Sequence, residues 1–267
     1  MIRVAVAGAA GRMGGRIISA VCASDQAELV GAFEAPGHSA LEQKISVIAG
    51  CPNAPGFVAS DPARAIKAAD VLIDFTAPEA TLANLDICAQ ASKAAVVGTT
   101  GMQDQQIDQA RQYAQDIPLV MAPNMSVGMN LMFKLVGQMA EVLGDEYALE
   151  LVEAHHDQKK DAPSGTAVRL IAELCRVRGW DPEETVRHGR QGMVGARASD
   201  ELGVSVIRGG DIVGDHTVYF VGHGERLELT HRAHSRDTFA RGALRAALWV
   251  VGREPGLYDM ADVLGLN

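Results

Sequence analysis

The chain has 267 residues, 48% of them hydrophobic, and a formal net charge of −9. It is therefore long enough to bury a core without staples, as one large domain or two modest ones. The acidic balance without a basic tract argues against nucleic-acid binding, and the first apolar run, VAVAGAA, is too short and glycine-rich for a signal peptide or a membrane span.

The four cysteines give no sign of a disulfide framework or a zinc site. Cys22, Cys51, Cys88 and Cys175 lie far apart along the chain and form no C-x-x-C pair. We therefore expect no bound metal, no membrane attachment and a location in the reducing cytoplasm.

Short β-branched runs alternate with longer segments of helical period over the first 125 residues. This pattern is typical of a parallel sheet with helices on both faces. The predicted strands are 2–8, 27–33, 69–75, 94–100 and 117–123. The predicted helices are 11–23, 61–69, 78–92 and 102–116. The pattern predicts an α/β fold with a Rossmann-like, doubly wound parallel sheet.

Beyond residue 126 the rhythm changes to that of a second, α+β domain with a mixed sheet. Helices are predicted at 127–143, 164–178 and 237–252. Strands are predicted at 147–156, 204–210, 216–222 and 225–233, and turns between the last three permit antiparallel pairing. The glycine-spaced stretch 187–203 is predicted to be an exposed loop. The final helix is amphipathic, and periodicity leaves open which domain it joins.

The first strand ends in GAAGRMG, residues 8–14, directly before a predicted helix. Backbone N–H groups and the helix dipole can face a pyrophosphate there. The spacing departs from G-x-G-x-x-G, because Ala10 stands where the second glycine would fall. We favour dinucleotide binding over the alternative that the glycines only turn the chain into the helix.

Glu34 ends the second predicted strand about 20 residues beyond the glycine loop, where an acidic side chain can bind the adenosine ribose hydroxyls. A carboxylate there repels a 2′-phosphate, and the neighbouring Ala35 brings no positive charge. The pair favours NADH over NADPH, without excluding NADPH. The alternative for Glu34 is an ordinary solvated carboxylate at a strand end.

Small and polar residues follow two later strands, in GTTG at 98–101 and APNMS at 122–126. Both segments lie at the carboxyl edge of the predicted sheet, where doubly wound folds bind ligands. Thr99, Thr100 and Asn124 can hydrogen-bond a nicotinamide ribose or carboxamide. Asn124 and Ser126 can equally cap the next helix, and we favour that role for Ser126.

The stretch EAHHDQKKDAPSGT, residues 153–166, crowds titratable side chains ahead of a predicted helix. His155 and His156 are adjacent in a strand and so point in opposite directions, which argues against a shared metal ion. A solvated surface loop is the simplest alternative. Two lysines before a helix start with free N–H groups favour an anion site instead, and a histidine beside it is suited to proton transfer.

Together these motifs resemble the dihydrodipicolinate reductase family, which reduces 4-hydroxy-tetrahydrodipicolinate to tetrahydrodipicolinate with NAD(P)H in the diaminopimelate route to lysine. The resemblance spans nearly the whole chain, through VAVAGAAGRMG, IDFTAPE, VVGTTG, APNMSVGMN, RGGDIVGDHTV and GLYDMADVLGL. Its most specific element is EAHH, a lysine, and DAPSGTA. It implies an oxidoreductase acting on a cyclic dicarboxylate.

The resemblance implies a cofactor site in the first domain. Its pyrophosphate would lie on Gly8, Ala9, Ala10, Gly11, Arg12 and Met13. Its adenosine ribose would contact Glu34. Its nicotinamide half would contact Gly98, Thr99, Thr100, Ala122, Pro123, Asn124 and Met125.

The resemblance also implies a substrate site in the second domain. His155 matches the family's proton donor or acceptor, and Lys159 matches its proton-donating lysine. The matching substrate contacts are His156, Gly165 and Thr166. We expect Lys160 and the helix start at Ser164 to help hold the carboxylates.

Domain organisation follows from the same resemblance. Residues 1–126 and 236–267 would form a discontinuous cofactor domain, and 127–235 a domain for substrate binding and for assembly into a homotetramer. Catalysis would then need closure about segments near 126 and 236.

The chain departs from the family at a few positions and leaves other roles open. Ala35 stands where many members have Arg, and Asp157 and Gln158 also differ. We expect His231 and His234 to be structural, with Arg236 a candidate near the hinge. Two other functions remain: a dehydrogenase of a different small dicarboxylate, and a nucleotide-sensing protein without catalysis.

Overall fold

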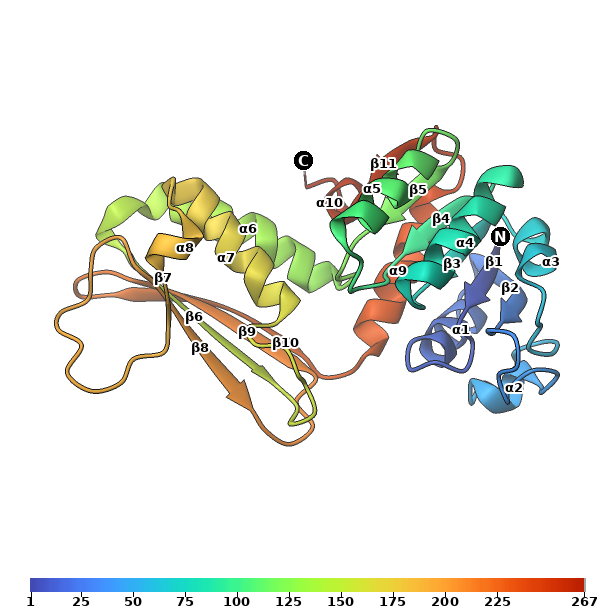
Figure 1. Cartoon of the computed structure of the whole chain (residues 1–267), viewed down its shortest axis with the longest axis horizontal. Coiled ribbons are helices and arrows are strands. Elements are labelled where there is room, and N and C mark those ends of the chain that lie inside the picture. Colours follow the sequence, from blue (N-terminus) through green and yellow to red (C-terminus); the bar gives the residue numbers. More distant parts are fainter. Residues whose placement is uncertain (267) are drawn as a thin grey trace. The chain divides into compact units, whose positions relative to one another are not determined.

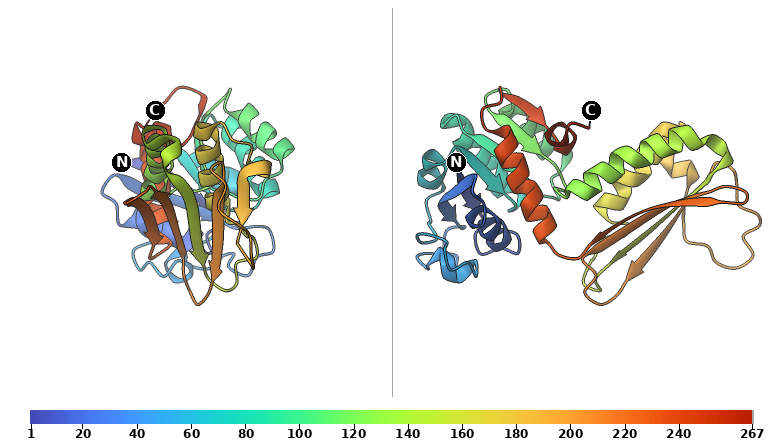
Figure 2. Two further views of the ribbon diagram at one scale, coloured as in Figure 1. Left: turned by 90° about the vertical axis from the view of Figure 1, so that its left-hand side faces the viewer. Right: turned by 180° about the vertical axis from the view of Figure 1, so that it is seen from behind.

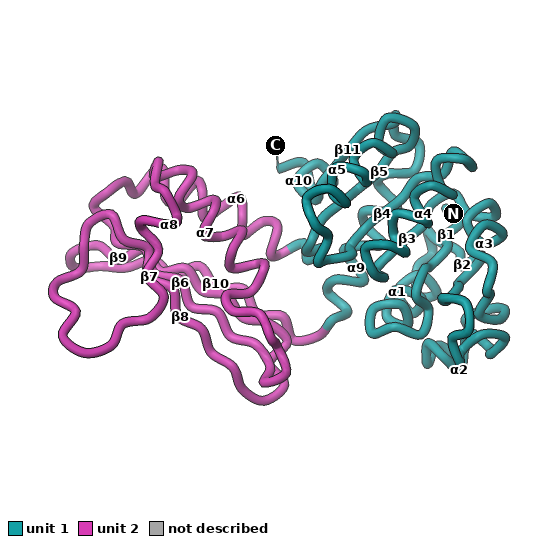
Figure 3. The backbone as a smooth tube through the Cα atoms, in the orientation of Figure 1, with its two compact units in different colours: residues 1–127, 236–267 teal, residues 128–235 magenta. Residues whose placement is uncertain are grey.

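The computed structural model describes residues 1–266, which form two compact units (Figure 3). Unit 1 combines Met1–Val127 with the chain from Arg236 onward, and unit 2 is Gly128–Ser235. Each unit has its own sheet and its own apolar core. None of the described helices is both long and apolar enough to cross a membrane.

Unit 1 is built on a six-stranded parallel sheet in the order β11-β5-β4-β3-β1-β2 (Figure 1). The strands are β1 (Ile2–Ala7), β2 (Ala27–Phe33), β3 (Val71–Asp74), β4 (Ala94–Val97), β5 (Pro118–Met121) and β11 (Gly256–Tyr258). The helices are α1 (Gly14–Cys22), α2 (Ile45–Ile48), α3 (Pro62–Ala68), α4 (Pro78–Gln90), α5 (Asp104–Tyr113), α9 (Asp237–Val250) and α10 (Met260–Leu264). The predicted doubly wound sheet is confirmed, and β11 extends it by an edge strand that the sequence analysis did not predict.

Alternate residues of the strands belong to two apolar layers, one on each face of this sheet. Val4 and Val6 of β1 pack in the layer that contains α1 and α9, whereas Ala5 and Ala7 face the layer of α3, α4 and α5. Figure 2 shows α9 in red alongside the sheet, and α1 contacts it directly. Because both faces are covered, the strands are nearly continuous apolar runs.

Unit 2 is a five-stranded mixed sheet in the order β10-β9-β6-β8-β7. Its strands are β6 (Ala148–His155), β7 (Val186–His188), β8 (Leu202–Arg208), β9 (Gly214–Val221) and β10 (Arg226–Ala233). Its helices are α6 (Val127–Leu143), α7 (Gly165–Arg178) and α8 (Pro182–Thr185), with the short 3-10 helix η1 (Gly144–Glu146). The two long helices, α6 and α7, lie together on one face of the sheet (Figures 1 and 2).

Two features of this sheet differ from the prediction. β8 and β9 are not neighbours, because β6 lies between them, parallel to β8 and antiparallel to β9. The predicted loop 187–203 is wrong at both ends, since Val186–His188 form β7 and Leu202 begins β8. An edge strand of three residues is too short to display a period-two pattern, so the sequence carries little signal for it.

The central strand β6 leads from the core of unit 2 into a polar cluster. Leu149 and Leu151 belong to the apolar layer under α6 and α7, and Glu153 and His155 continue the same face of the strand. On β9, Val218 and Phe220 belong to that layer, and His216 shares their face. The face is therefore apolar under the helices and polar where β6 ends.

Candidate active site

The glycine loop of unit 1 has a geometry that only small residues allow. Gly8 adopts φ +68°, a conformation that favours glycine. A Cβ at Gly14 would lie 2.0 Å from the Gly8 carbonyl oxygen, so α1 can start against the loop only with a glycine there. The N–H groups of Gly8 and Ala9 both donate to the Phe33 carbonyl, which ties the loop to the end of β2.

Glu34 lies directly beside this loop. Its Oε1 accepts a hydrogen bond from the Ala10 N–H at 2.8 Å, and its Oε2 accepts from the Ala35 N–H at 3.2 Å. Met13, the residue before α1, provides no side-chain cap, so the first turn of α1 can offer N–H groups to an anion. A donor-rich loop at a helix start with a carboxylate beside it fits a dinucleotide.

Thr99, one of the predicted nicotinamide residues of GTTG, contacts a buried carboxylate at the end of β3. Asp74 is fully buried, and its Oδ1 accepts from the Thr76 N–H at 2.9 Å and the Thr76 hydroxyl at 2.6 Å. Thr99 is buried, and its hydroxyl lies 2.8 Å from that of Thr81. The Thr99 side chain is thus used internally, whereas Thr100 is exposed at the strand end.

The second predicted segment, 122–126, is partly core. Ala122 and Met125 are buried in the layer of α1 and α9, so they can reach a ligand mainly through their backbone. Asn124 Oδ1 accepts a hydrogen bond from the Ser126 N–H at 2.9 Å, as expected of a residue that caps a helix start. Pro123 is exposed.

In unit 2 the polar cluster is organised by Glu153, which is fully buried. Arg208 at the end of β8 donates to both of its oxygens, at 2.7 and 2.8 Å. Glu153 Oε1 also accepts from the Ser164 N–H at 2.9 Å, and Oε2 lies 2.7 Å from His155 Nδ1. Burial acts to raise the pKa of Glu153, but these donors outweigh it and the pKa is lowered.

The buried His155 is held in one tautomer by this carboxylate. Because ionised Glu153 can only accept, His155 Nδ1 must carry a hydrogen. Burial lowers the pKa of His155 despite the opposing effect of Glu153, so the ring is neutral at pH 7. Its Nε2 makes no hydrogen bond to other residues in the described range 1–266, and it passes so near Gly214 that a Cβ there would lie 2.9 Å away.

A second buried histidine supports the first. The rings of His155 and His216 meet edge to face, with centroids 5.2 Å apart. His216 Nε2 lies 2.9 Å from the Ser164 hydroxyl. Burial, with the charge of His155 adding to it, lowers the pKa of His216 to about 3. The His216 ring is therefore neutral at physiological pH and packs against His155.

The predicted cations lie on the loop between β6 and α7. Lys159 is half-buried and its Nζ lies 2.9 Å from an Asp161 carboxylate oxygen. This lysine is the first cause of a lowered pKa at Asp161. His156 is half-buried, and Lys160 is exposed. The two adjacent histidines differ in burial: His155 is buried in the cluster, whereas His156 follows the end of β6 and is half-buried.

The start of α7 completes the cluster. Ser164 is the N-cap, and its hydroxyl accepts from the Ala167 N–H at 3.1 Å. Gly165 is exposed, with no heavy atom within 4 Å of the position that a Cβ would take. The helix therefore presents its positive end to an open space next to Thr166.

Three residues of the cluster were missed from the sequence: Glu153, Arg208 and His216. Glu153 had a usable signal, because it lies two positions before His155 in a strand and so shares its face. Arg208 and His216 are opposite His155 and Glu153 in the sheet, which requires knowing that β6 lies between β8 and β9. Over residues 1–266, no three potential metal-ligating side chains gather into a metal site.

Comparison with protein families gives two matches that together cover almost the whole chain. The family model for the N-terminus of dihydrodipicolinate reductase matches residues 2–125. The family model for the C-terminus of dihydrodipicolinate reductase matches residues 128–264.

Individual relatives agree. The chain is 50% identical to the 4-hydroxy-tetrahydrodipicolinate reductase of Geotalea daltonii and 52% identical to that of Syntrophotalea carbinolica, in each case over 100% of both chains. Among solved structures, a dipicolinate-bound dihydrodipicolinate reductase from Paenisporosarcina sp. TG-14 aligns with a TM-score of 0.76 and 28% identity, covering 98% of each chain. An amine dehydrogenase from Mycobacterium smegmatis, at TM-score 0.57 and 14% identity over 96% and 94% of the two chains, shares the fold.

Proposed function

The chain belongs to the dihydrodipicolinate reductase family and is an oxidoreductase, and we propose that it reduces 4-hydroxy-tetrahydrodipicolinate to tetrahydrodipicolinate in the diaminopimelate route to lysine, with NADH preferred over NADPH. Free thiols at all four cysteines are compatible with work in a reducing cytoplasm. The observation that carries the proposal is the His155 cluster, a neutral, oriented histidine close to a lysine-bearing loop and a helix start.

The cofactor would be held by unit 1. The loop Gly8–Met13 and the start of α1 would bind the pyrophosphate through N–H groups. Glu34 accepts one N–H at each oxygen, and a carboxylate has about four acceptor sites, so both oxygens can still accept from ribose hydroxyls. Exposed Thr100 and the backbone of 98–99 and 122–125 would contact the nicotinamide half. The bound nicotinamide supplies a hydride.

His155 would manage a proton at its Nε2 atom. With Nδ1–H bound to Glu153, the Nε2 lone pair is the basic position of the ring. A ring that takes up a proton at Nε2 would be stabilised by Glu153, whose charge Arg208 already partly balances. His155 and Lys159 together would then provide the proton that accompanies hydride addition and loss of the substrate hydroxyl as water.

The substrate is a dianion, and the loop and α7 would receive its carboxylates. Lys160 is exposed, His156 and Thr166 are half-buried, and α7 is open at Gly165. Ser164 would act by capping α7, since its hydroxyl already bonds within the cluster. Lys159 would exchange its bond to Asp161 for one to the substrate.

Because cofactor and substrate would bind to different units, the reaction would need the two units to approach each other around residues near 126 and 236. We also propose a homotetramer formed through the sheet of unit 2. The face of this sheet opposite α6 and α7 carries exposed Ile207 and Val221, at 51% and 38% exposure. Light scattering of the purified chain should give the mass of four chains, and Ile207→Arg should shift it to a smaller assembly.

The decisive experiment uses purified enzyme, NADH, and substrate made in situ by dihydrodipicolinate synthase, with NADH oxidation as the readout. We expect turnover that falls strongly in His155→Ala and Lys159→Ala, with NADH affinity nearly unchanged. The proposal fails if no NADH is consumed while an unrelated dicarboxylate supports turnover. Unchanged activity in both variants would instead favour a nucleotide-sensing protein without catalysis.

Cofactor preference has its own test, in which kcat/KM is measured with NADH and with NADPH. We expect NADH to be better, because Glu34 repels a 2′-phosphate. Ala35→Arg should raise the NADPH value by about tenfold or more, as one charge-assisted bond allows. Ala35→Gln is the control of similar size without charge, and an equal gain in both variants would contradict the electrostatic explanation.

A further inference from the structure

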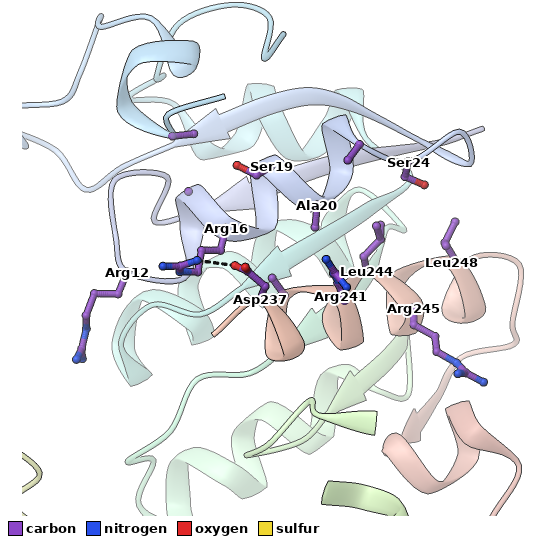
Figure 4. Close-up of a pocket in the computed structure, with 14 residues that line it drawn as sticks. Arg12, Arg16, Ser19, Ala20, Ser24, Asp237, Arg241, Leu244, Arg245 and Leu248 are labelled. Atoms are coloured by element: carbon purple, nitrogen blue, oxygen red, sulfur yellow. Dashed lines mark hydrogen bonds and ion pairs between the residues drawn. The ribbon is translucent and has the colours of Figure 1, made fainter. Parts of the chain in front are cut away.

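A groove with a volume of about 830 Å³ runs between α1 and α9 in unit 1 (Figure 4). One side is formed by the glycine loop and α1, and the other by α9. The volume lies within the range of small-molecule sites, about 300–1,000 Å³. Glu34, the expected ribose contact, is not part of its lining.

Small side chains keep this groove open. Gly15, Ser19 and Ala23 follow one another at every fourth position and so share one face of the α1 segment. Across from them, Leu244 and Leu248 provide an apolar wall on α9. The groove therefore offers an apolar surface and a serine hydroxyl along its length.

Its charge is opposite to that of the chain as a whole. Arg12, Arg16, Arg241 and Arg245 line the groove with one carboxylate, that of Asp237, whereas the chain carries a net charge of −9. Arg16 already bonds to Asp237, at 2.5 Å. Figure 4 shows this pair at one end of the groove and Arg245 further along α9.

The other three arginines of the groove have no partner among residues 1–266. Arg12, Arg241 and Arg245 make no hydrogen bond or ion pair with other residues of the described range. Arg241 and Arg245 lie four residues apart on one helix, where like charges repel each other. In Figure 4 the Arg241 side chain extends from α9 toward α1. An anion between them would remove the repulsion and use guanidinium groups that match phosphate oxygens.

We propose that this groove is a second anion site, which binds an elongated metabolite carrying phosphate groups and an apolar portion. The phosphates would pair with Arg241, Arg245 and Arg16, and the apolar portion would lie on Leu244 and Leu248. Arg12 lies within the glycine loop and Arg16 in the first turn of α1, so occupation of the groove would be coupled to dinucleotide binding, and the coupling would act in both directions. The proposal does not depend on the identity of the reaction.

Tripolyphosphate is a suitable probe, titrated by calorimetry into the full chain with and without saturating NADH. With NADH saturating the cofactor loop, we expect one tripolyphosphate site per chain; without NADH the empty glycine loop can bind the probe as well. Arg241→Glu combined with Arg245→Glu should weaken binding by about tenfold or more, since it replaces two charge-assisted bonds with repulsion. Thermal unfolding of each variant checks that the fold is kept.

The matched control is Arg64→Glu with Lys67→Glu, which makes the same charge change at two exposed positions of α3 outside the groove. This pair should bind tripolyphosphate nearly as the unchanged protein does. Three results would overturn the proposal: no binding to the unchanged protein, binding that disappears with NADH because the probe occupies the cofactor loop, or equal weakening in both variant pairs.

Discussion

Each unit buries a carboxylate completely, Asp74 in unit 1 and Glu153 in unit 2, but the two are satisfied in different ways. Asp74 is surrounded by neutral donors: hydroxyls, the Thr76 N–H and the Asn84 amide, which lies 2.8 Å from Oδ2. Glu153 is bound by the guanidinium of Arg208, by His155 and by the Ser164 N–H.

The difference bears on what each carboxylate can do. Neutral donors fix the ends of β3 and β4 without introducing a second charge, which suits a segment that only shapes a binding surface. The Glu153 cluster joins a charge to a titratable ring, so a change in the protonation of His155 is felt by its partners. The comparison predicts that Asp74 acts on structure, whereas Glu153 acts on structure and on proton transfer.

The largest effect is expected for Glu153→Gln on catalysis. The amide can donate to or accept from His155 Nδ1, so the tautomer with a free Nε2 is no longer enforced. We expect kcat to fall by about 10²–10⁴-fold, the range of general acid–base contributions, with NADH affinity kept. Nitrogen NMR of the ligand-free chain should show more Nε2–H form of His155, a readout that does not require turnover. If kcat were unchanged in Glu153→Gln, Glu153 would have no role in proton transfer, and it would not differ from Asp74 in function.

Removal of the cation from Glu153 should have the next largest effect. Arg208→Met leaves a buried charge without its ion-pair partner and should lower the free energy of unfolding by about 3–5 kcal/mol. The loss should shrink toward pH 5, because Glu153 can then take up a proton. Arg208→Lys keeps the charge and should lose less. Urea unfolding of the three proteins measures these differences, and equal losses would contradict the ion-pair explanation.

The third prediction concerns pH. The pKa of His216 is lowered by burial from 6.5 to about 3, so below pH 6.5 the unfolded chain takes up a proton that the native chain does not. As the pH is lowered below 6.5, the free energy of unfolding should therefore decrease. At pH 4 the decrease from His216 alone should be roughly 3 kcal/mol. Unfolding at pH 7 and pH 4 should show a smaller difference for His216→Gln. His223→Gln, at an exposed histidine, should behave as the unchanged protein does.

The smallest effect is expected in unit 1. Both oxygens of the Asp74 carboxylate accept hydrogen bonds. In Asp74→Asn one oxygen is replaced by an NH2 group, which cannot accept, so one of the surrounding donors loses its acceptor. We expect a loss of about 1–3 kcal/mol in unfolding free energy. Asp70→Asn is the control, because Asp70 pairs with Arg3 at the surface and should cost less than about 1 kcal/mol. If Asp74→Asn lowered the free energy of unfolding as much as Arg208→Met does, the proposed difference between the two buried carboxylates would be contradicted.

Much of unit 1 could be predicted from the sequence because its signals are local. Runs such as Ala27–Phe33 are largely apolar and are followed by a polar residue, and the structure has this strand at the predicted bounds. The position of Glu34 beside the glycine loop follows from the order of one strand–helix–strand unit. The placement of α9 against α1 depends on packing at long range and could not be read from periodicity.

Unit 2 was less predictable because its cluster is assembled across strands distant in the sequence. His155 and Lys159 stood out by residue type, and a strand was expected at 147–156, where the structure has Ala148–His155. The pairing of His155 with Arg208 depends on a parallel contact between β6 and β8 that turn signals did not indicate. Glu153 shares the strand face of His155, but a charged residue in a strand normally indicates the solvent face, so its complete burial was not predicted.

The central place of β6 has a consequence for motion. It is hydrogen-bonded to β9 on one side and to β8 on the other, and His155 is its last residue. Its amide hydrogens should therefore exchange with solvent only in openings close to global unfolding, whereas those of the Lys159 loop should exchange through local fluctuations. The two proposed proton-handling groups would then differ in kind: one is held as rigidly as the sheet itself, and the other can follow the substrate.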